Sequence, residues 1–293
     1  MGRNVLSRVT IVLEAIKFPH SIFALPFALL GCFLAARSWP GSVKLILVIL
    51  AMASVRSVAM SYNRLVDHEL DKINPRTADR ALPSGTLSRR SLWIFLALSA
   101  FAAALVCLLF EYLFNNTYPI VLLPFLLVYV TAYSHTKRFT WLCHYWLGSV
   151  LGLAVVAGAI AVDPTRLSWG PILVGLGVCF WTAGFDIIYS LLDIDHDCRE
   201  KVQSIAARFG PARALWVSRG THAAAFAFFA WGGHLSRLDG FYLVGLLTAG
   251  ALLVLEHRLV RADDFSRVNV AFFTVNGVLS VLLSGMGVID VLY

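Results

Sequence analysis

Long apolar segments alternate with short polar segments along the whole chain. A helix needs about 20 consecutive apolar residues to cross a bilayer, and nine segments approach that length. We therefore predict an all-α, polytopic membrane protein in which each of these segments forms a transmembrane helix. The predicted spans cover about residues 17–38, 43–63, 92–111, 117–134, 143–162, 169–192, 212–233, 239–258 and 268–290.

The polar segments between the spans are mostly short, which indicates one integral-membrane domain over residues 1–293. The longer polar segments, about 64–91, 135–142 and 193–211, are expected to be loops that cap one end of the helices. Residues 4–16 are expected to form a short amphipathic helix on the membrane surface. No cleavable signal peptide is expected, because the start of the chain has no small-residue cleavage site.

Composition excludes an ordinary soluble domain, because only 14% of the residues are charged and 59% are hydrophobic. Soluble domains average about a quarter charged residues. Cytoplasmic loops of membrane proteins carry an excess of Lys and Arg. With the N-terminus inside, 18 of the 24 basic residues fall in inside segments, and the outside loops hold only Arg37, Lys44, Arg166 and Arg237. We therefore expect a protein of a bacterial-type inner membrane with a cytoplasmic N-terminus, cytoplasmic cap loops and an outside C-terminus. The same loops account for the net charge of +7, so no nucleic-acid partner is implied.

Acidic residues recur at four-residue intervals at the inner ends of two predicted spans. Asn63, Asp67 and Asp71 form the first cluster, and Asp186, Tyr189, Asp193 and Asp197 form the second cluster. On a helix this spacing places the carboxylates along one face, where like charges cost stability unless cations lie between them. Mg²⁺ prefers a few carboxylates together with substrate phosphates. A single pair would more simply be a solvated helix end, but the repeated pattern favours a metal and diphosphate site.

Basic residues follow both clusters. Arg76 and Arg80 lie five and nine residues beyond Asp71, and Lys201 follows the second cluster. Arginine offers planar, two-pronged hydrogen bonding to phosphate oxygens, so we predict that these cations bind the diphosphate. Tyr133 and Lys137 lie four residues apart at the inner end of the fourth span. They are expected to add a phenol and an ammonium group beside the site.

Arg56 lies inside the second predicted span, seven residues before Asn63 and on the same helical face. An arginine within a span is costly and usually faces a partner or a polar cavity. Arg56 is therefore a candidate substrate-binding residue. The alternative is a structural ion pair with a carboxylate in another span.

The remaining ionisable residues in the spans are expected to have structural roles. His144 and His222 show no metal-ligand spacing and are interpreted as packing or interfacial residues. Arg219 and Glu256 lie near span edges, where long charged side chains can reach water. The five cysteines show no metal-ligand spacing either.

The residues described above resemble the motifs of the UbiA superfamily of membrane aromatic prenyltransferases, over essentially the full length of the chain. The first cluster with Arg76 and Arg80, the stretch from Leu82 to Gly85, the Tyr133 and Lys137 pair, and the second cluster carry the resemblance. It implies nine transmembrane helices around a central cavity. It also implies that two Mg²⁺ ions hold a polyprenyl diphosphate through Asn63, Asp67, Asp71, Asp193 and Asp197.

Within the superfamily the chain is most similar to 4-hydroxybenzoate polyprenyltransferases. This implies Mg²⁺-dependent transfer of a polyprenyl group to an aromatic carboxylic acid in quinone biosynthesis, with 4-hydroxybenzoate and ubiquinone as the first interpretation. The stretches over residues 17–26 and 56–65 also resemble a branch linked to menaquinone, in which the acceptor is a dihydroxynaphthoate. Both acceptors are phenolic carboxylic acids, so the motifs leave this alternative open.

The resemblance and the charges together suggest a role for each candidate residue. The growing charge on the leaving diphosphate would be stabilised electrostatically by Arg76, Arg80, Lys137 and Lys201. Tyr133 and Tyr189 would shield the allylic cation through their ring faces. Asp186 would remove the ring proton or orient the acceptor phenol. Arg56 would pair with the acceptor carboxylate.

Two other functional classes also place acidic residues in membrane helices. A transporter would need discontinuous helices in paired positions, whereas these charges lie at the ends of spans. A CDP-alcohol phosphotransferase uses clustered aspartates as well, but its initial Asp-Gly-x2-Ala-Arg pattern does not occur in this chain. The sequence therefore favours prenyl transfer over both.

Overall fold

The computed structural model describes residues 22–293, and the regular elements in that part of the chain are all helical. Pairing of extended backbone there is limited to an isolated bridge between Arg261 and Asp264. The prediction of an all-α membrane protein is confirmed. The amphipathic helix predicted for residues 4–16, and the start of the first predicted span, lie outside the described residues.

A helix lies at the position of each predicted span, and within the described residues seven are long and apolar enough to cross a bilayer. The short helix α2 (Leu25–Ala36) and the longer but less apolar α11 (Pro211–Leu235) are not among the seven. For these two, membrane crossing stays a prediction. The seven are α3 (Ser42–Val66), α5 (Arg89–Phe114), α6 (Tyr118–Thr136), α7 (Cys143–Val162), α8 (Trp169–Tyr189) with its extension, α12 (Gly240–Leu259), and η4 (Val270–Val275) continued by α13 (Asn276–Leu292).

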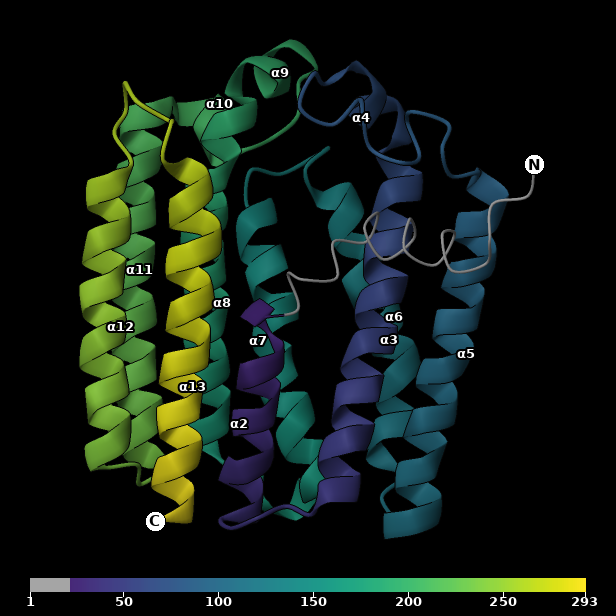
Figure 1. Ribbon diagram of the computed structural model, residues 1–293, viewed down its shortest axis with the longest axis vertical. Helices are drawn as coiled ribbons and strands as arrows, with labels where there is room; N and C mark the ends of the chain where they lie inside the picture. Colours follow the sequence, from purple (N-terminus) through teal and green to yellow (C-terminus); the bar gives the residue numbers. More distant parts are fainter. Residues whose placement is uncertain (1–21) are drawn as a thin grey trace. The chain divides into compact units, whose positions relative to one another are not determined.

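Figure 1 labels the helices of the described chain, which its internal contacts divide into two compact units. The first unit covers residues 49–135 and contains most of α3, the short helix α4 (His68–Ile73), α5 and α6. The second unit covers residues 22–48 and 136–293. Its short helices α9 (Ile194–Arg199) and α10 (Ile205–Phe209) follow α8. The single domain predicted for residues 1–293 stays a prediction.

In the first unit, the cap loop between α4 and α5 has a small hydrophobic core of its own. Leu82 and Leu87 are buried together with Leu92 of α5, and Leu65 of α3 packs against them. Ser88 caps α5 by accepting a hydrogen bond from the backbone N–H of Ser91 at 3.1 Å. These contacts hold the loop against the ends of α3 and α5.

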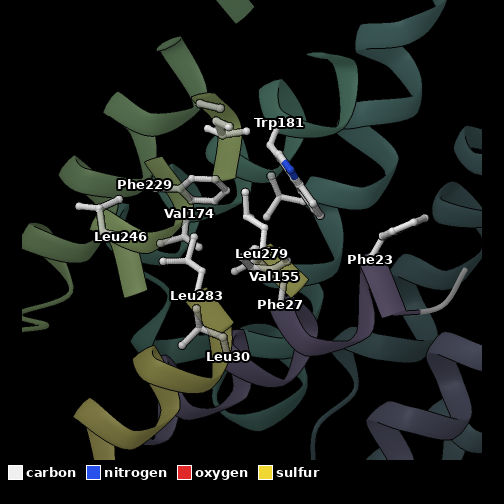
Figure 2. Packing of buried hydrophobic residues seen from close by; sticks show 14 of the residues in the cluster. Phe23, Phe27, Leu30, Val155, Val174, Trp181, Phe229, Leu246, Leu279 and Leu283 are labelled. Atoms are coloured by element: carbon white, nitrogen blue, oxygen red, sulfur yellow. The ribbon is translucent and has the colours of Figure 1, made fainter. Parts of the chain in front are cut away.

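In the second unit, α8 packs against both α7 and α11, and its buried side chains form the centre of the core. Figure 2 shows Trp181 of α8 among aliphatic and aromatic side chains from the neighbouring helices. Phe27 and Phe229 stack with their ring centroids 5.7 Å apart. The Trp181 indole N–H donates to Asn276 Oδ1 at 2.7 Å, so its polar atom is satisfied inside the core.

Glu256 of α12 belongs to the same buried hydrogen-bond network as Trp181 and Asn276. Its side chain is fully buried, and its Oε1 accepts a hydrogen bond from Asn276 Nδ2 at 2.9 Å. The interpretation of Glu256 as a span-edge charge that reaches water is therefore wrong. The reason is that Glu256 lies on the face of α12 that is packed inside the unit, where a buried carboxyl group needs hydrogen-bond partners.

Glycines allow α7 and α8 to approach closely. A Cβ atom built on Gly148 would lie 2.1 Å from the carbonyl oxygen of Cys179, and one built on Gly152 would lie 2.3 Å from that of Gly175. Both distances are far below van der Waals contact. Small residues at such crossings are typical of membrane helices, whose association depends on close packing because lipid supplies no hydrophobic driving force.

We expect Gly148→Ala and Gly152→Ala to destabilise the protein by more than the 1–3 kcal/mol that overpacking costs, as a rough guide. The atoms in the way are backbone, so the helices must separate. Gly220→Ala in α11 is the matched control, because its added methyl group would meet nothing within 4 Å. Thermal unfolding in one detergent measures the difference. Equal unfolding midpoints for Gly148→Ala and Gly220→Ala would contradict this account of the crossing.

Candidate active site

The first cluster spans a break between two helices. Helix α3 ends at Val66 and α4 begins at His68, with Asp67 between them at φ −90° and ψ 5°. The backbone N–H of Asp67 still donates to the Asn63 carbonyl at 2.9 Å, and that of Asp71 donates to the Asp67 carbonyl at 2.7 Å. The four-residue spacing therefore keeps its helical hydrogen bonds across the break.

The second cluster has the same backbone arrangement in the other unit. Helix α8 ends at Tyr189, the 3-10 turn η3 covers Ser190–Asp193, and α9 begins at Ile194. Asp193 has φ −111° and ψ 6°, close to the values of Asp67. Both aspartates lie in the sparsely allowed bridge region, in which many active-site residues are found. The resemblance between the clusters thus extends from their sequence to their backbone.

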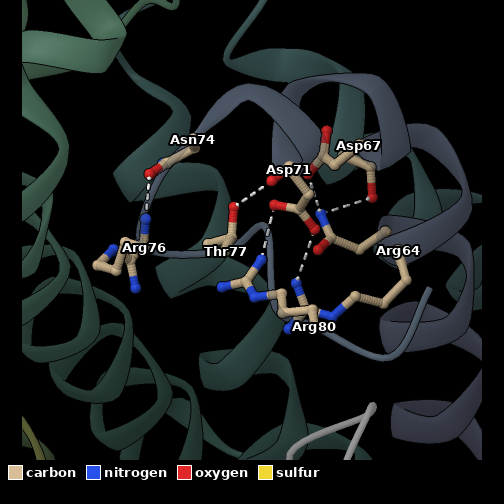
Figure 3. A network of polar contacts seen from close by, with 9 residues as sticks. Arg64, Asp67, Asp71, Asn74, Arg76, Thr77 and Arg80 are labelled. Carbon is tan, nitrogen blue, oxygen red and sulfur yellow. Dashed lines mark hydrogen bonds and ion pairs between the residues drawn. The ribbon is translucent and has the colours of Figure 1, made fainter. Parts of the chain in front are cut away.

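Arginines surround Asp71 in the first cluster (Figure 3). Asp71 Oδ1 accepts a hydrogen bond from Arg80 Nη1 at 2.7 Å, and Asp71 Oδ2 lies 3.6 Å from Arg64 Nη1. Thr77 Oγ1 donates to the carbonyl oxygen of Asp71 at 2.9 Å. Arg80, which we predicted to bind phosphate, is thus bound to a carboxylate of the cluster, and the exposed Arg76 lies on the same loop.

The other half of the first cluster is attached to α6. Asn63 Nδ2 donates to Asp67 Oδ2 at 2.9 Å and to Ser134 Oγ at 3.4 Å. One residue earlier on α3, the hydroxyl of Tyr62 forms a hydrogen bond with His135 Nε2 at 3.0 Å. These contacts fix the end of α3 beside the end of α6. Sequence spacing could not reveal them, because α3 and α6 are far apart in the chain.

Two predicted residues lie near this network in the first unit. Tyr133 of α6 interacts electrostatically with the buried Arg64. Arg56 lies on α3, as predicted, and is partly buried. Its positive charge is repelled by that of Arg64, which lies two turns further along the same helix. Arg64 is thus a central cation of this region, and the sequence pattern did not single it out.

Asp186 of the second cluster is bound to a histidine. His144 Nε2 accepts a hydrogen bond from the backbone N–H of Ile205 at 3.3 Å, so this nitrogen carries no proton. His144 Nδ1 is then protonated and donates to Asp186 Oδ2 at 2.7 Å. This proton assignment follows from the hydrogen-bond partners. His144 is therefore a neutral imidazole that orients the Asp186 carboxylate, and its interpretation as a packing residue was incomplete.

The other carboxylates of the second cluster lie beside a cation. Asp197 is buried and accepts a hydrogen bond from the Ser204 side chain. Its carboxylate is repelled by Asp193 and attracted by Lys137. The carbonyl oxygen of Lys137 accepts from the backbone N–H of Gln203 at 2.7 Å, which ties the two cap loops of this unit together. Lys201 is exposed, and within residues 22–293 no hydrogen bond or ion pair joins it to the cluster.

Tyr189 lies against aromatic side chains of the final membrane segment. Its ring centroid is 4.1 Å from that of Phe272 and 6.3 Å from that of Phe273. Both phenylalanines belong to η4, a π-helical turn of a kind that often occurs at functional sites. Phe185 continues the group, with its centroid 5.1 Å from that of Phe272. The second cluster therefore adjoins a wall of aromatic rings.

The donor atoms of both clusters suit Mg²⁺. Within residues 22–293, no three His, Cys, Asp or Glu side chains form a complete metal site. Each cluster instead offers two aspartates, and the buried Asp71 Oδ2 makes no hydrogen bond among the described residues. Mg²⁺ is usually bound by one or two carboxylates plus substrate phosphates and water. Oxygen-only pairs of this kind therefore fit Mg²⁺ better than zinc, which prefers nitrogen and sulfur ligands.

Comparisons with known proteins agree with this chemistry. Residues 24–278 match the model of the UbiA prenyltransferase family. A 4-hydroxybenzoate octaprenyltransferase from Chromohalobacter salexigens is 27% identical over 256 residues, which cover 87% of this chain and 83% of the relative. The apo structure of a UbiA homolog from Aeropyrum pernix K1 is 32% identical, with a TM-score of 0.83, and the match covers 94% of this chain and 98% of that one.

A more distant solved structure has the same fold. It is a UbiA homolog from Archaeoglobus fulgidus bound to GPP and Mg²⁺. It is 16% identical, with a TM-score of 0.68, and the match covers 96% of this chain and 99% of that one.

Proposed function

The chain belongs to the UbiA prenyltransferase family, and we propose that it transfers a polyprenyl group from a polyprenyl diphosphate to 4-hydroxybenzoate in a Mg²⁺-dependent step of quinone biosynthesis. The observation that carries this proposal is the pair of aspartates at a helix break in each unit, with cations beside them. The name of the curated relative supports the choice of acceptor. Family membership favours this reaction over transport and over CDP-alcohol phosphotransfer.

We assign binding of the diphosphate to the two clusters. Asn63, Asp67, Asp71, Asp193 and Asp197 would hold Mg²⁺, which when bound neutralises charge on the diphosphate. Arg80 is within hydrogen-bond distance of Asp71, so its guanidinium can exchange from this carboxylate to a phosphate oxygen. Arg76 on the same loop, Lys137 beside Asp197, and Lys201 supply further positive charge. Cleavage of the carbon–oxygen bond then leaves an allylic cation on the prenyl chain.

Aromatic rings stabilise this cation in the proposed reaction. The ring centroids of Tyr189 and Phe272 lie 4.1 Å apart with the planes inclined by 31°, so the two rings stack on each other within one aromatic cluster. Ring faces attract cations through their quadrupoles. Tyr133 has the same role in the first unit. Exclusion of water by these rings favours attack by the acceptor over hydrolysis.

The acceptor ring forms a carbon–carbon bond at the position ortho to its phenol, and the proton at that carbon must then leave. We assign Asp186 as the group that accepts this proton. The N–H of His144 holds one oxygen of the Asp186 carboxylate at 2.7 Å, which orients the carboxylate. Arg56 is assigned to the acceptor carboxylate, because it lies on α3 two turns before Asn63 and its planar guanidinium matches a carboxylate.

Product identification tests the proposal. Purified protein in detergent would be incubated with Mg²⁺, a polyprenyl diphosphate and, separately, 4-hydroxybenzoate or a dihydroxynaphthoate. We expect a prenylated 4-hydroxybenzoate by mass, and no product after chelation of the metal. Arg56→Gln should raise the KM for the acceptor by tenfold or more, on the order of the 2–5 kcal/mol that loss of a charge partner costs. Product from the naphthoate alone would overturn the acceptor assignment, and an equal loss for both substrates in Arg56→Gln would overturn that of Arg56.

A further inference from the structure

An open pocket lies apart from both clusters, between the first turns of α11 and the end of α12. Its volume is about 430 Å³. Its wall includes Trp216 and Arg219 from α11, and His257, Arg258 and Arg261 from the end of α12 and the residues that follow. Because α8 leads through α9 and α10 directly into α11, the pocket lies at the same end of the second unit as the second cluster. The proposed reaction uses none of these residues.

The pocket is strongly basic. Three arginines line it and no acidic residue does. Arg258 and Arg261 are exposed, while Arg219 lies over the Trp216 ring at 4.6 Å from its centroid. Within the described residues, no ion pair joins these three arginines to a carboxylate. Asp264 in the following loop attracts Arg261 electrostatically, and its Oδ1 accepts from the backbone N–H of Ser266 at 2.9 Å. With three arginines and no carboxylate in its wall, the pocket keeps an excess of positive charge.

The wall of the pocket is anchored in the core of the unit. The Nε2–H group of His222 donates a hydrogen bond to the carbonyl oxygen of Trp181 at 3.2 Å. Its Nδ1 is then an acceptor, and His257 Nε2 donates to it at 3.0 Å. This chain of hydrogen bonds connects the pocket residue His257 to Trp181 of α8. The position of His257 is therefore fixed from inside the protein, and His222 is more than a packing residue.

The surface below the pocket suits an acyl chain. Trp216 is 68% exposed, as is common for tryptophans at a membrane–water interface. Deeper along the same face of α11, the exposed residues Gly220, Ala223 and Ala227 are small, so no large side chain there would obstruct an acyl chain. One turn before Arg258, Val254 and Leu255 of α12 expose apolar side chains. A ligand with an anionic head and an apolar tail matches this combination better than a free anion does.

We propose that this pocket binds a phosphate group, carried by the headgroup of an anionic phospholipid whose acyl chain lies along α11 and α12. Arginine forks match phosphate oxygens, and basic pockets between membrane helices are known binding sites for anionic headgroups. Such a lipid fastens α11 to α12 at the end of the unit where the second cluster lies. The site is separate from diphosphate binding, so its test does not depend on turnover.

Lipid binding to the purified protein, counted by native mass spectrometry, tests the proposal. The double variant Arg258→Gln/Arg261→Gln removes two pocket cations, and Arg213→Gln/Arg267→Gln removes two exposed arginines that do not line the pocket. We expect the wild type to retain phosphatidylglycerol in preference to phosphatidylcholine. The pocket variant should bind phosphatidylglycerol about 25-fold more weakly, because each basic residue near the surface contributes roughly a factor of five. The control variant should change binding much less.

A second arm distinguishes lipid from free phosphate. Excess inorganic phosphate is added to the protein loaded with phosphatidylglycerol. Retention of the lipid supports the headgroup as the ligand, while displacement in the wild type but not in the pocket variant supports a phosphate site filled from solution. Equal weakening in the pocket and control variants would overturn the proposal, because it would show only general attraction between a basic protein and anionic lipid. Equal retention of phosphatidylglycerol and phosphatidylcholine would overturn it as well. Circular dichroism verifies that both variants are folded.

Discussion

Asp71→Asn is expected to reduce the rate of prenyl transfer by about a thousandfold or more. The variant should lose several kcal/mol of electrostatic stabilisation of the leaving diphosphate, and each loss of about 1.4 kcal/mol lowers the rate tenfold. The substitution keeps the size of the side chain and the hydrogen bond from Thr77 to the backbone. It removes the negative charge that would bind Mg²⁺ and that now binds Arg80 and Arg64. Asp193→Asn should have an effect of the same size, because Asp193 is also assigned to Mg²⁺ and occupies the helix break of the second unit, as Asp67 does in the first. Turnover at saturating Mg²⁺ is the measurement.

Two nearby acidic residues provide matched controls for these variants. Glu69 lies on α4 beside Asp71 but is exposed and pairs with Arg89 at 3.2 Å. Asp195 lies between the carboxylates of the second cluster and is also exposed. Glu69→Gln and Asp195→Asn should retain nearly full activity. If Asp71→Asn or Asp193→Asn behaved like its control, with the protein folded, the cluster concerned could not be a metal and diphosphate site.

Asp186→Asn is expected to lower kcat by about 100- to 10,000-fold, the usual contribution of a positioned general base. An amide cannot accept the ring proton, but it preserves the shape of the side chain beside His144. The KM values for both substrates should change little, because Asp186 is assigned to proton removal and not to binding. Steady-state kinetics with each substrate varied in turn measure both quantities. An unchanged kcat would remove Asp186 from the mechanism.

His144 is a positioning residue in this scheme, so its variants have a different signature. His144→Leu removes the hydrogen bond to Asp186 and should lower kcat by about 10- to 100-fold, as a hydrogen bond to a charged group contributes roughly 1.5–3 kcal/mol. His144→Gln retains an N–H donor on a flexible side chain and should restore part of the loss. If Gln and Leu reduced kcat equally while both proteins kept the wild-type unfolding midpoint, the orienting role would be wrong.

Hydropathy predicted the long helices well, because a bilayer requires apolar segments of nearly uniform length. The predicted span 143–162 coincides with α7, for example. The breaks at Asp67 and Asp193 were not predictable in this way. Neither residue has an adjacent glycine or proline, which are the usual signals of an interrupted helix. The four-residue spacing of the carboxylates is compatible with both a continuous helix and a broken one.

The composition of the candidate site was predictable, but several of its contacts were not. Periodicity relates residues one or two turns apart, as in the Asn63 to Asp71 series. The hydrogen bond between His144 and Asp186 joins residues 42 positions apart, on different helices. It depends on how α7 packs against α8, which a single sequence does not encode in any local pattern. The same limit applies to Glu256 and Asn276, which we could not pair before their helices were placed.

The close crossing of α7 and α8 has a consequence for engineering the enzyme toward other acceptors. Gly148 and Gly152 on α7 face backbone atoms of α8, and α8 carries Asp186 near its end. A mutant library that randomises these glycines would consist mostly of misassembled proteins, and selection would discard them before any change in specificity could be seen. Positions such as Gly220 and Gly285, where an added methyl group meets nothing within 4 Å, tolerate variation at low risk. Mutant libraries should therefore vary residues near Arg56 and leave the glycines at the α7–α8 crossing unchanged.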